Sequence, residues 1–365
     1  MKKKFAEYYN LSQNDYNDIW KDALIVFDTN ILLNLYKCTD DTRAEFISVM
    51  KFYESRLWLP YQVALEFNRN RISIICGNSQ AYSQLSKKLE EEIQKAIKTV
   101  EGWEKALYKT HPYISLNEIK SNFTRTISTV KKKLVKLETE HPDLLEYDSI
   151  FNDITNIYDG KVGENYNEEQ LEKIYQEGKK RYEQKIPPGY CDENDKKNRS
   201  KQEIFGDLII WKQILDKSKS ESKNIIFVSN DEKEDWKLEY NGKTIGARKE
   251  LIKEFFDVTG KKILIYNSQC FLEYAKSNKS PKISQKTIEN IKRIAEDSKQ
   301  QMQRINEIIQ NINESCKPLK LDFMSGVHSE SFENFRRLQE QLNMPLYGII
   351  PSKDKILPEI SHEEL

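Results

Sequence analysis

The sequence predicts an α/β fold of three layers, with a central parallel sheet, a long inserted helical hairpin and a C-terminal helical extension. Short apolar runs rich in Val and Ile alternate with amphipathic helical segments, which is typical of parallel strands buried on both faces. The expected strands span residues 24–28, 57–60, 224–229 and 262–266. The expected helices span residues 31–37, 42–54, 61–75, 204–218, 247–257 and 268–276.

An inserted arm is expected between the second of these strands and the third. Two apolar stripes at helical spacing predict antiparallel helices of ~25 residues and ~38 Å each, packed on each other. The stripes consist of Leu85, Leu89, Ile93, Ile97, Val100, Trp103 and Leu107, and of Ile119, Phe123, Ile127, Val130, Leu134 and Leu137. Ser115 and Glu118 form a capping-box signature, which places the start of the second helix.

A further helix is expected over residues 283–313, where a stripe follows the three-four spacing of a coiled coil. The stripe consists of Ile288, Ile291, Ala295, Ser298, Met302, Ile305, Ile309 and Ile312. It needs a partner, which could be the inserted hairpin, a second copy of the chain or another protein. The expected parts of the chain are a first core part (1–76), the arm (77–185), a second core part (186–278) that begins with a basic loop (186–203), and the C-terminal helix and tail (279–365).

Acidic residues occupy comparable places along the chain. Asp28 ends the first apolar run and Asp231 follows the third, and functional residues in open α/β sheets gather where such strands end. Glu66 and Asp207 lie on helical segments whose apolar residues must pack against the sheet. Asp28 alone could simply cap a helix. Four acids in such places favour one shared acidic site, and Asp235 either adds a further acid to it or pairs with a Lys.

Over roughly residues 15–276 the chain resembles the PIN-like domain nucleases, in particular the group with a long helical insertion. The matching pieces are residues 27–36, 57–71, 186–190, 206–211 and 227–236. The resemblance implies that Asp28, Glu66, Asp207 and Asp231 are the catalytic and metal-binding acids, with Asn30 and Ser229 in supporting positions. Where such proteins usually have Thr-Asp-Asp, this chain has Ser229, Asn230 and Asp231, which lowers the local negative charge by one.

The residue types also predict the chemistry. Carboxylates crowded into one site repel one another, and a divalent cation relieves the repulsion. Since the chain has four His and scattered Cys, we expect oxygen ligands and therefore one or two Mg²⁺ or Mn²⁺ ions. Asp28 and Asp231 are expected as direct ligands, and Glu66 and Asp207 as direct or water-mediated ones. Such ions activate a water for hydrolysis of a phosphodiester, so we expect a metal-dependent endonuclease, a hydrolase without a covalent intermediate.

Basic residues near the acids are candidates for binding the phosphate backbone of a substrate. They are Arg69, Arg71, Lys196, Lys197, Arg199, Lys201 and Lys233. For each of them the alternative is a solvated surface residue, and the basic loop could equally be a plain connector. A functional loop would grip or gate the substrate through its phosphates.

The partner expected from the resemblance is nucleic acid, with RNA favoured over DNA. A toxin or antiphage defence effector restrained by a partner is compatible with this activity. The alternatives are a structure-specific DNA nuclease, and a catalytically silent nucleic-acid-binding or scaffold protein. A silent protein would have no reason to keep all four acids.

Composition limits these interpretations. With 365 residues, 38% hydrophobic and 32% charged, the chain can bury a core and still carry long exposed helices. No run approaches the ~20 apolar residues of a membrane span, so no membrane partner is expected. The first four residues, Met-Lys-Lys-Lys, lack the apolar segment of a signal peptide, and five scattered Cys suggest a reducing cytoplasm. A formal net charge of zero argues against a protein that coats nucleic acid without preference.

Overall fold

The computed structural model describes residues 1, 5–106, 115–193, 199–241, 243–278 and 281–297. All of them belong to the first of two units of the chain, Met1–Gln310, and the second unit, Asn311–Leu365, lies outside the described residues. Within the described ranges, no helix is both long and apolar enough to cross a membrane.

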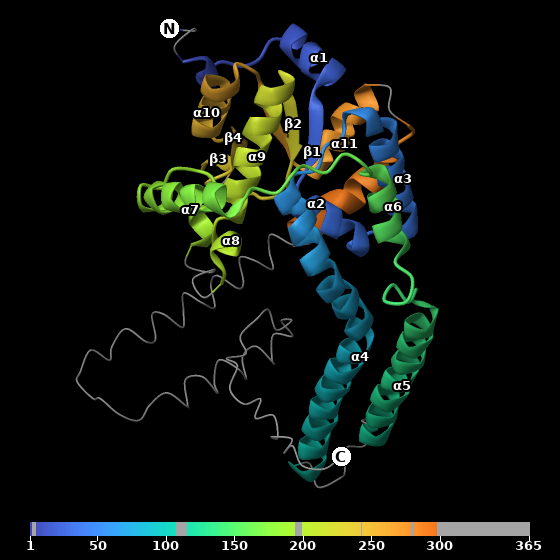
Figure 1. The fold of residues 1–365 in the computed structure, drawn as a ribbon. Helices are drawn as coiled ribbons and strands as arrows, with labels where there is room; N and C mark the ends of the chain where they lie inside the picture. The colour runs from blue at the N-terminus through green and yellow to red at the C-terminus, as the bar shows by residue number, and fades with distance from the viewer. Residues whose placement is uncertain (2–4, 107–114, 194–198, 242, 279–280, 298–365) are drawn as a thin grey trace, which may run out of the picture. The chain divides into compact units, whose positions relative to one another are not determined.

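A three-stranded parallel sheet forms the centre of the fold (Figure 1). Its strands are β1 (Leu24–Phe27), β2 (Ile225–Val228) and β5 (Ile263–Tyr266), in the order β1-β2-β5. Every residue of β1 and β2 is buried, as their Val- and Ile-rich runs predict. The strand expected over 57–60 forms only isolated parallel bridges, from Leu57 to Ile25 and from Leu59 to Val162.

The register of the sheet brings two strand ends together. Phe27 pairs with Val228, and the backbone N–H of Asp28 donates to the carbonyl of Val228 at 2.9 Å. Asp28 and Ser229 therefore leave the sheet side by side, at the edge where parallel strands present functional groups.

Helices cover both faces of the sheet and make it the middle of three layers. Phe27 packs against Phe46 and Phe271 on one face, while Phe227 packs against Trp236, which contacts Trp211 on the other. The core helices are α1 (Gln13–Asp22), α2 (Thr29–Asn34), α3 (Asp40–Phe52), α9 (Gly206–Glu221), α10 (Lys249–Thr259) and α11 (Ser268–Ser277).

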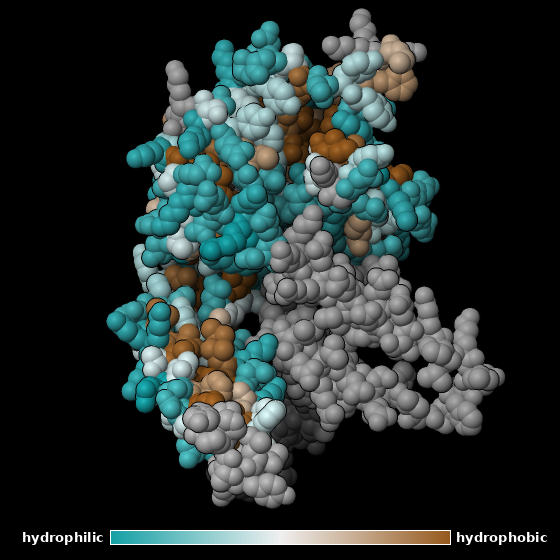
Figure 2. Space-filling model, turned by 180° about the vertical axis from the view of Figure 1, so that it is seen from behind, coloured by the Kyte–Doolittle hydropathy of each residue, from teal (hydrophilic) through white to brown (hydrophobic). Residues whose placement is uncertain are grey.

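The arm begins inside the core. Helix α4 (Tyr61–Ala106) runs for 46 residues without a break, so the helix that holds Glu66 continues directly into the arm. Helix α5 (Leu116–Glu140) begins at Ser115, whose Oγ accepts from the N–H of Glu118 at 3.2 Å, as the capping signature predicts. The two helices lie side by side (Figure 1), and apolar side chains gather on this part of the molecule between polar ones (Figure 2). Four residues of the expected stripes remain exposed, namely Leu85, Trp103, Ile119 and Leu137.

Smaller elements complete the described chain. They are helices α6 (Ser149–Ile157), α7 (Glu168–Glu183) and α8 (Lys201–Ile204), the antiparallel hairpin β3 (Lys237–Tyr240) and β4 (Lys243–Ala247), and the 3₁₀ turns η1 (Ala6–Tyr8), η2 (Leu35–Lys37), η3 (Glu54–Arg56) and η4 (Tyr190–Asp192). The sequence patterns predicted neither the hairpin nor α1, α6 and α7, because these segments are short or mixed in polarity.

The start of the C-terminal helix packs on the core. Residues 285–297 are helical, and Ile288 and Ile291 are buried. Asn290 Nδ2 donates to Thr42 Oγ1 of α3 at 3.0 Å. This part of the stripe therefore finds its partner within the chain's own core, which was not among the three partners expected. Residues 298–313 lie outside the described part of the chain.

Candidate active site

Three donors hold the carboxylate of Asp28 where β1 ends. As the N-cap of α2, Asp28 accepts from the N–H of Thr29 through Oδ1 at 2.7 Å. Its Oδ2 accepts from Ser229 Oγ at 2.6 Å and from Asn30 Nδ2 at 2.5 Å. Asp28 therefore both caps α2 and belongs to a polar cluster, although the sequence presented these two roles as alternatives.

Asn30 and Ser229 connect the two strand ends. Asn30 Oδ1 accepts from the N–H of Asn230 at 3.0 Å, and Ser229 Oγ accepts from the N–H of Asp231 at 3.1 Å. Ser229 is only 1% exposed, so these bonds are protected from water. The structure thus places both expected supporting residues in contact with Asp28.

Glu66 approaches this cluster from α4. Its Oε2 accepts from Thr29 Oγ1 at 2.9 Å, and its Oε1 accepts from Gln62 Nε2, one helical turn earlier, at 2.9 Å. Helix α9 packs closely here: a Cβ on Gly206 would lie 2.7 Å from Glu66 Oε1. A side chain at this position would therefore force the Glu66 carboxylate to shift.

Asp207 lies in the first turn of α9, beside the turn that follows Pro188. A Cβ on Gly189 would lie 3.2 Å from Cβ of Asp207, and Gly189 has a φ of 96°. The turn is fixed by Asp235, whose Oδ2 accepts from the N–H groups of Gly189 at 2.8 Å and Cys191 at 3.2 Å. Asp235 therefore pairs with backbone donors rather than with a Lys.

Lys233 supplies positive charge at the same place. Its Nζ lies 3.1 Å from Asp231 Oδ2 and 2.5 Å from Asp192 Oδ1. Burial disfavours its charge, but Asp231, Asp207 and Asp192 outweigh that effect and raise the pKa of Lys233 above its usual value. The lysine is thus a built-in cation among the acids.

The acids act on one another electrostatically. Burial raises the pKa of Asp28 to about 7; the Ser229 hydrogen bond opposes the rise, and the charges of Asp207, Glu66 and Asp231 add to it. Burial, with the charges of Asp207 and Asp231, likewise raises the pKa of Asp235 to about 6. All four acids singled out in the sequence therefore contribute to one electrostatic site.

The donor set fits a hard divalent cation. Among the described residues, no three Asp, Glu, His or Cys side chains are arranged so that they could hold one ion together. Mg²⁺, however, is commonly held by one or two carboxylates and completes its shell with waters and substrate phosphates. Burial first, and then the charges of Asp207, Glu66 and Asp231, raise the pKa of Asp28, and a bound cation would favour its charged form.

Arg71, a candidate for phosphate binding, is engaged within the protein. Its guanidinium lies 2.8 Å from Asp148 and 4.1 Å above the ring of Phe151 in α6. Asp148 also accepts from Tyr36 Oη at 2.7 Å. Arg71 thereby ties α6 to α4, and binding a substrate phosphate would require it to leave Asp148.

The other basic candidates differ in their contacts. Lys201 pairs with Glu172 at 3.0 Å. Arg69 and Arg199 are exposed and have no hydrogen bond or ion pair to another described residue. Lys196 and Lys197 lie outside the described ranges.

Residues that the sequence did not indicate also shape the site. Gln62 orients Glu66, and its own Oε1 accepts from Gln202 Nε2 at 3.0 Å. Asp192 is 8% exposed and pairs with Lys233 from a distant part of the chain. A glutamine one turn before a catalytic candidate is a usable signal for Gln62. No local pattern indicates Asp192.

Comparison with known proteins agrees with the fold. Residues 24–251 match a protein family described as a PIN-like domain, and this range covers more than half of the chain and includes all four acids. The chain therefore belongs to the PIN-like domain family, which supports a nuclease-type hydrolase with nucleic acid as its substrate class. Searches of curated proteins and of solved structures returned no match.

Proposed function

We propose that the chain is a metal-dependent endonuclease that hydrolyses phosphodiester bonds, with RNA as the favoured substrate. The observation that carries the proposal is the mutual effect of the four carboxylates, which helps to raise the pKa of Asp28 to about 7. A catalytic metal site typically holds several carboxylates near one another although their charges repel.

On this proposal, Asp28 and Asp231 hold a Mg²⁺ or Mn²⁺ ion, and Glu66 and Asp207 contribute directly or through water. The ion, when bound, activates a water and stabilises the leaving oxygen of the phosphodiester. The protein's own residues fix the geometry. Ser229 and Asn30 orient the Asp28 carboxylate, and Thr29 and Gln62 orient that of Glu66.

Lys233 has two tasks in this proposal. It keeps Asp231 in place through the 3.1 Å ion pair, and its side chain is 29% exposed, which leaves it accessible to a phosphate oxygen. Arg69 and Arg199 are the other candidates for contact with the substrate. We place the activity in a reducing cytoplasm, because the Cys residues of the described chain are free thiols.

The proposal is tested by cleavage of labelled single-stranded RNA, tRNA, single-stranded DNA and flapped DNA in Mn²⁺, Mg²⁺ or EDTA. We expect the wild type to cut RNA with either ion, and EDTA or Asp28→Asn to abolish cutting. Asp153→Asn is the matched control, because Asp153 pairs only with Lys51 on the surface at 3.1 Å. Cleavage that persists in EDTA and in Asp28→Asn would exclude the metal mechanism, and preferential cutting of flapped DNA would reassign the substrate.

A further inference from the structure

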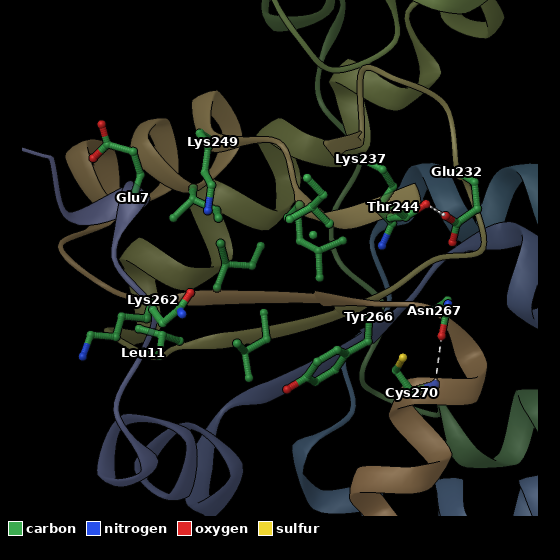
Figure 3. Close-up of a pocket in the computed structure, with 18 of the residues that line it drawn as sticks. Glu7, Leu11, Glu232, Lys237, Thr244, Lys249, Lys262, Tyr266, Asn267 and Cys270 are labelled. Carbon is green, nitrogen blue, oxygen red and sulfur yellow. Dashed lines mark hydrogen bonds between the residues drawn. The ribbon is translucent and has the colours of Figure 1, made fainter. Parts of the chain in front are cut away.

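A second cavity lies away from the four acids. It has a volume of about 700 Å³ and lies against β5, the edge strand of the sheet, with β4, α10 and residues 7–11 as its other walls (Figure 3). None of Asp28, Glu66, Asp207 and Asp231 lines it. Its volume is within the range typical of small-molecule sites, about 300–1,000 Å³.

A buried lysine enters this cavity without a partner. Lys237 is 5% exposed, and its side chain extends from β3 into the cavity (Figure 3). Its amino group has no hydrogen bond or ion pair to any described residue. Burial lowers the pKa of Lys237, against the opposing influence of Glu232, Cys270 and Asp231. A buried ammonium without a counterion is unfavourable, so an anion in the cavity would stabilise it.

The other charged residues of the wall define where an anion fits. Lys249 also points into the cavity and has no ion pair to a described residue (Figure 3). By contrast, Lys253 pairs with Asp257, Lys262 pairs with Asp15, and Lys292 lies 3.8 Å from Glu296. Glu232 is held by Thr244 Oγ1 at 3.1 Å. Lys237, Lys249 and Lys261 therefore have no ion pair to a described residue, and the carboxylates of Glu7 and Glu232 line the same cavity. Of the three lysines, Lys237 is the buried one, so its amino group gains most from a bound anion.

Part of the remaining wall is apolar. Ile245, Ile252, Phe256, Ile265 and Tyr266 line it, and Phe256 is 47% exposed although it belongs to a core helix. Such a surface suits a flat apolar or aromatic group, with the amino group of Lys237 providing orientation.

We propose that this cavity binds a small organic anion, with its phosphate, sulfonate or carboxylate group on Lys237 and its apolar body on the Phe256 side. The cavity also borders residues 229–232, the loop that presents Asp231 to the acidic site. Ser229 and Asp231 face the acids, whereas Asn230 and Glu232 line the cavity. Asn230 Oδ1 accepts from the N–H and the Oγ of Ser268, both at 2.9 Å. A bound anion would therefore touch the loop that presents Asp231.

The test uses the full chain, without metal and without nucleic acid, so its outcome is independent of the proposed nuclease activity. The probes are 1-anilinonaphthalene-8-sulfonate, an aromatic anion, and N-phenyl-1-naphthylamine, its uncharged analogue. We expect saturable fluorescence with one anion per chain. Lys237→Met keeps the aliphatic stem and removes the charge, so it should weaken anion binding about tenfold, the effect of about 1.4 kcal/mol, and leave binding of the neutral analogue unchanged.

Lys253→Met is the matched control, because this lysine of the same wall already has Asp257 as its partner. It should bind both probes as the wild type does. Adenosine monophosphate and octanoate, added as competitors, distinguish an aromatic phosphate from an aliphatic carboxylate as the natural class. A wild type that does not bind the sulfonate saturably, or a Lys237→Met variant that binds it equally well, would overturn the proposal. A cooperative thermal transition in each variant shows that the probe reports a folded pocket.

Discussion

At the scale of residues, the candidate site depends on the charge of Asp28. The folded chain holds a proton on Asp28 up to about pH 7, whereas an unfolded Asp loses it near pH 3.9, so the folded state binds more protons in between. Asp235, with a pKa of about 6, acts in the same direction. Stability of the metal-free protein is therefore lost as the pH rises through these values. Acids with lowered pKa values, such as Asp15, are already ionised in both the folded and the unfolded state at pH 5.5. Their contribution to stability therefore does not change above that pH.

We therefore predict that the Tm in EDTA falls by about 5 °C between pH 5.5 and pH 7.5. Mn²⁺ should raise the Tm much more at pH 7.5 than at pH 5.5, because protons compete with the ion for Asp28. Thermal melts at the two pH values measure both effects. Asp28→Asn should lose the Mn²⁺ response, and an equal response at both pH values would contradict the assignment.

A second residue-scale prediction concerns the room left for Glu66. Gly206→Ala places a methyl group 2.7 Å from Glu66 Oε1, so the carboxylate must move. Since displacement of a catalytic group by ~1 Å can cost about 10²-fold in rate, we expect kcat to fall by that order. Gly77→Ala is the control, because its Cβ would meet nothing within 4 Å. It should leave kcat unchanged and stabilise α4 by about 0.5–1 kcal/mol. Comparable activity of both variants would argue against a catalytic Glu66.

At the scale of elements, the arm is joined to the core by continuous helix and by buried polar contacts. Helix α4 carries Glu66 and, five residues later, the Arg71 that holds α6 through Asp148. Arg71 was also a candidate for phosphate binding. A structural role and a substrate-binding role predict different effects of replacing Arg71.

For Arg71→Gln we expect a loss of about 2 kcal/mol of stability, because the Asp148 carboxylate loses a charged partner and keeps only neutral donors. The KM for RNA should remain within about twofold. Urea unfolding and steady-state kinetics of the same variant distinguish the roles. An unchanged stability with a raised KM would make Arg71 a substrate contact.

The basic loop gives a further element-scale prediction. Replacement of Lys196, Lys197, Arg199 and Lys201 by Ala should raise the KM for RNA and flatten its dependence on salt, because each lost phosphate contact removes about one unit from the slope. The kcat should be unchanged, because a phosphate contact away from the reacting group acts through substrate binding. An unchanged KM would identify the loop as a plain connector.

At the scale of the whole molecule, the sequence was informative where structure depends on local pattern. The buried runs of β1 and β2 and the acids that follow them were predicted, because burial on both faces leaves a continuous apolar signature. The hairpin β3–β4 was missed, since its residues are polar and partly exposed and it depends on cross-strand pairing. The apolar stripe that begins at Ile288 indicated that this helix packs against an apolar surface, but it did not identify that surface.

The candidate site likewise contains residues that a local sequence pattern predicts and residues that it does not. Asp28, Asn30, Ser229 and Asp231 are close in space because the ends of adjacent parallel strands meet, which a sequence pattern can anticipate. Asp192 reaches Lys233 only through tertiary packing of the turn fixed by Asp235. The lining of the cavity beside β5 likewise comes from distant segments, so nothing local in the sequence predicts that Lys237 is buried there.

The most direct test of the central claim is the position of Mn²⁺ in crystals soaked in that ion at pH 7.5, located by its anomalous scattering. We expect an anomalous peak between Asp28 and Asp231, with ligand oxygens at about 2.0–2.2 Å, and its loss in Asp28→Asn. A crystal without a peak there, or with Mn²⁺ bound only elsewhere, would contradict it.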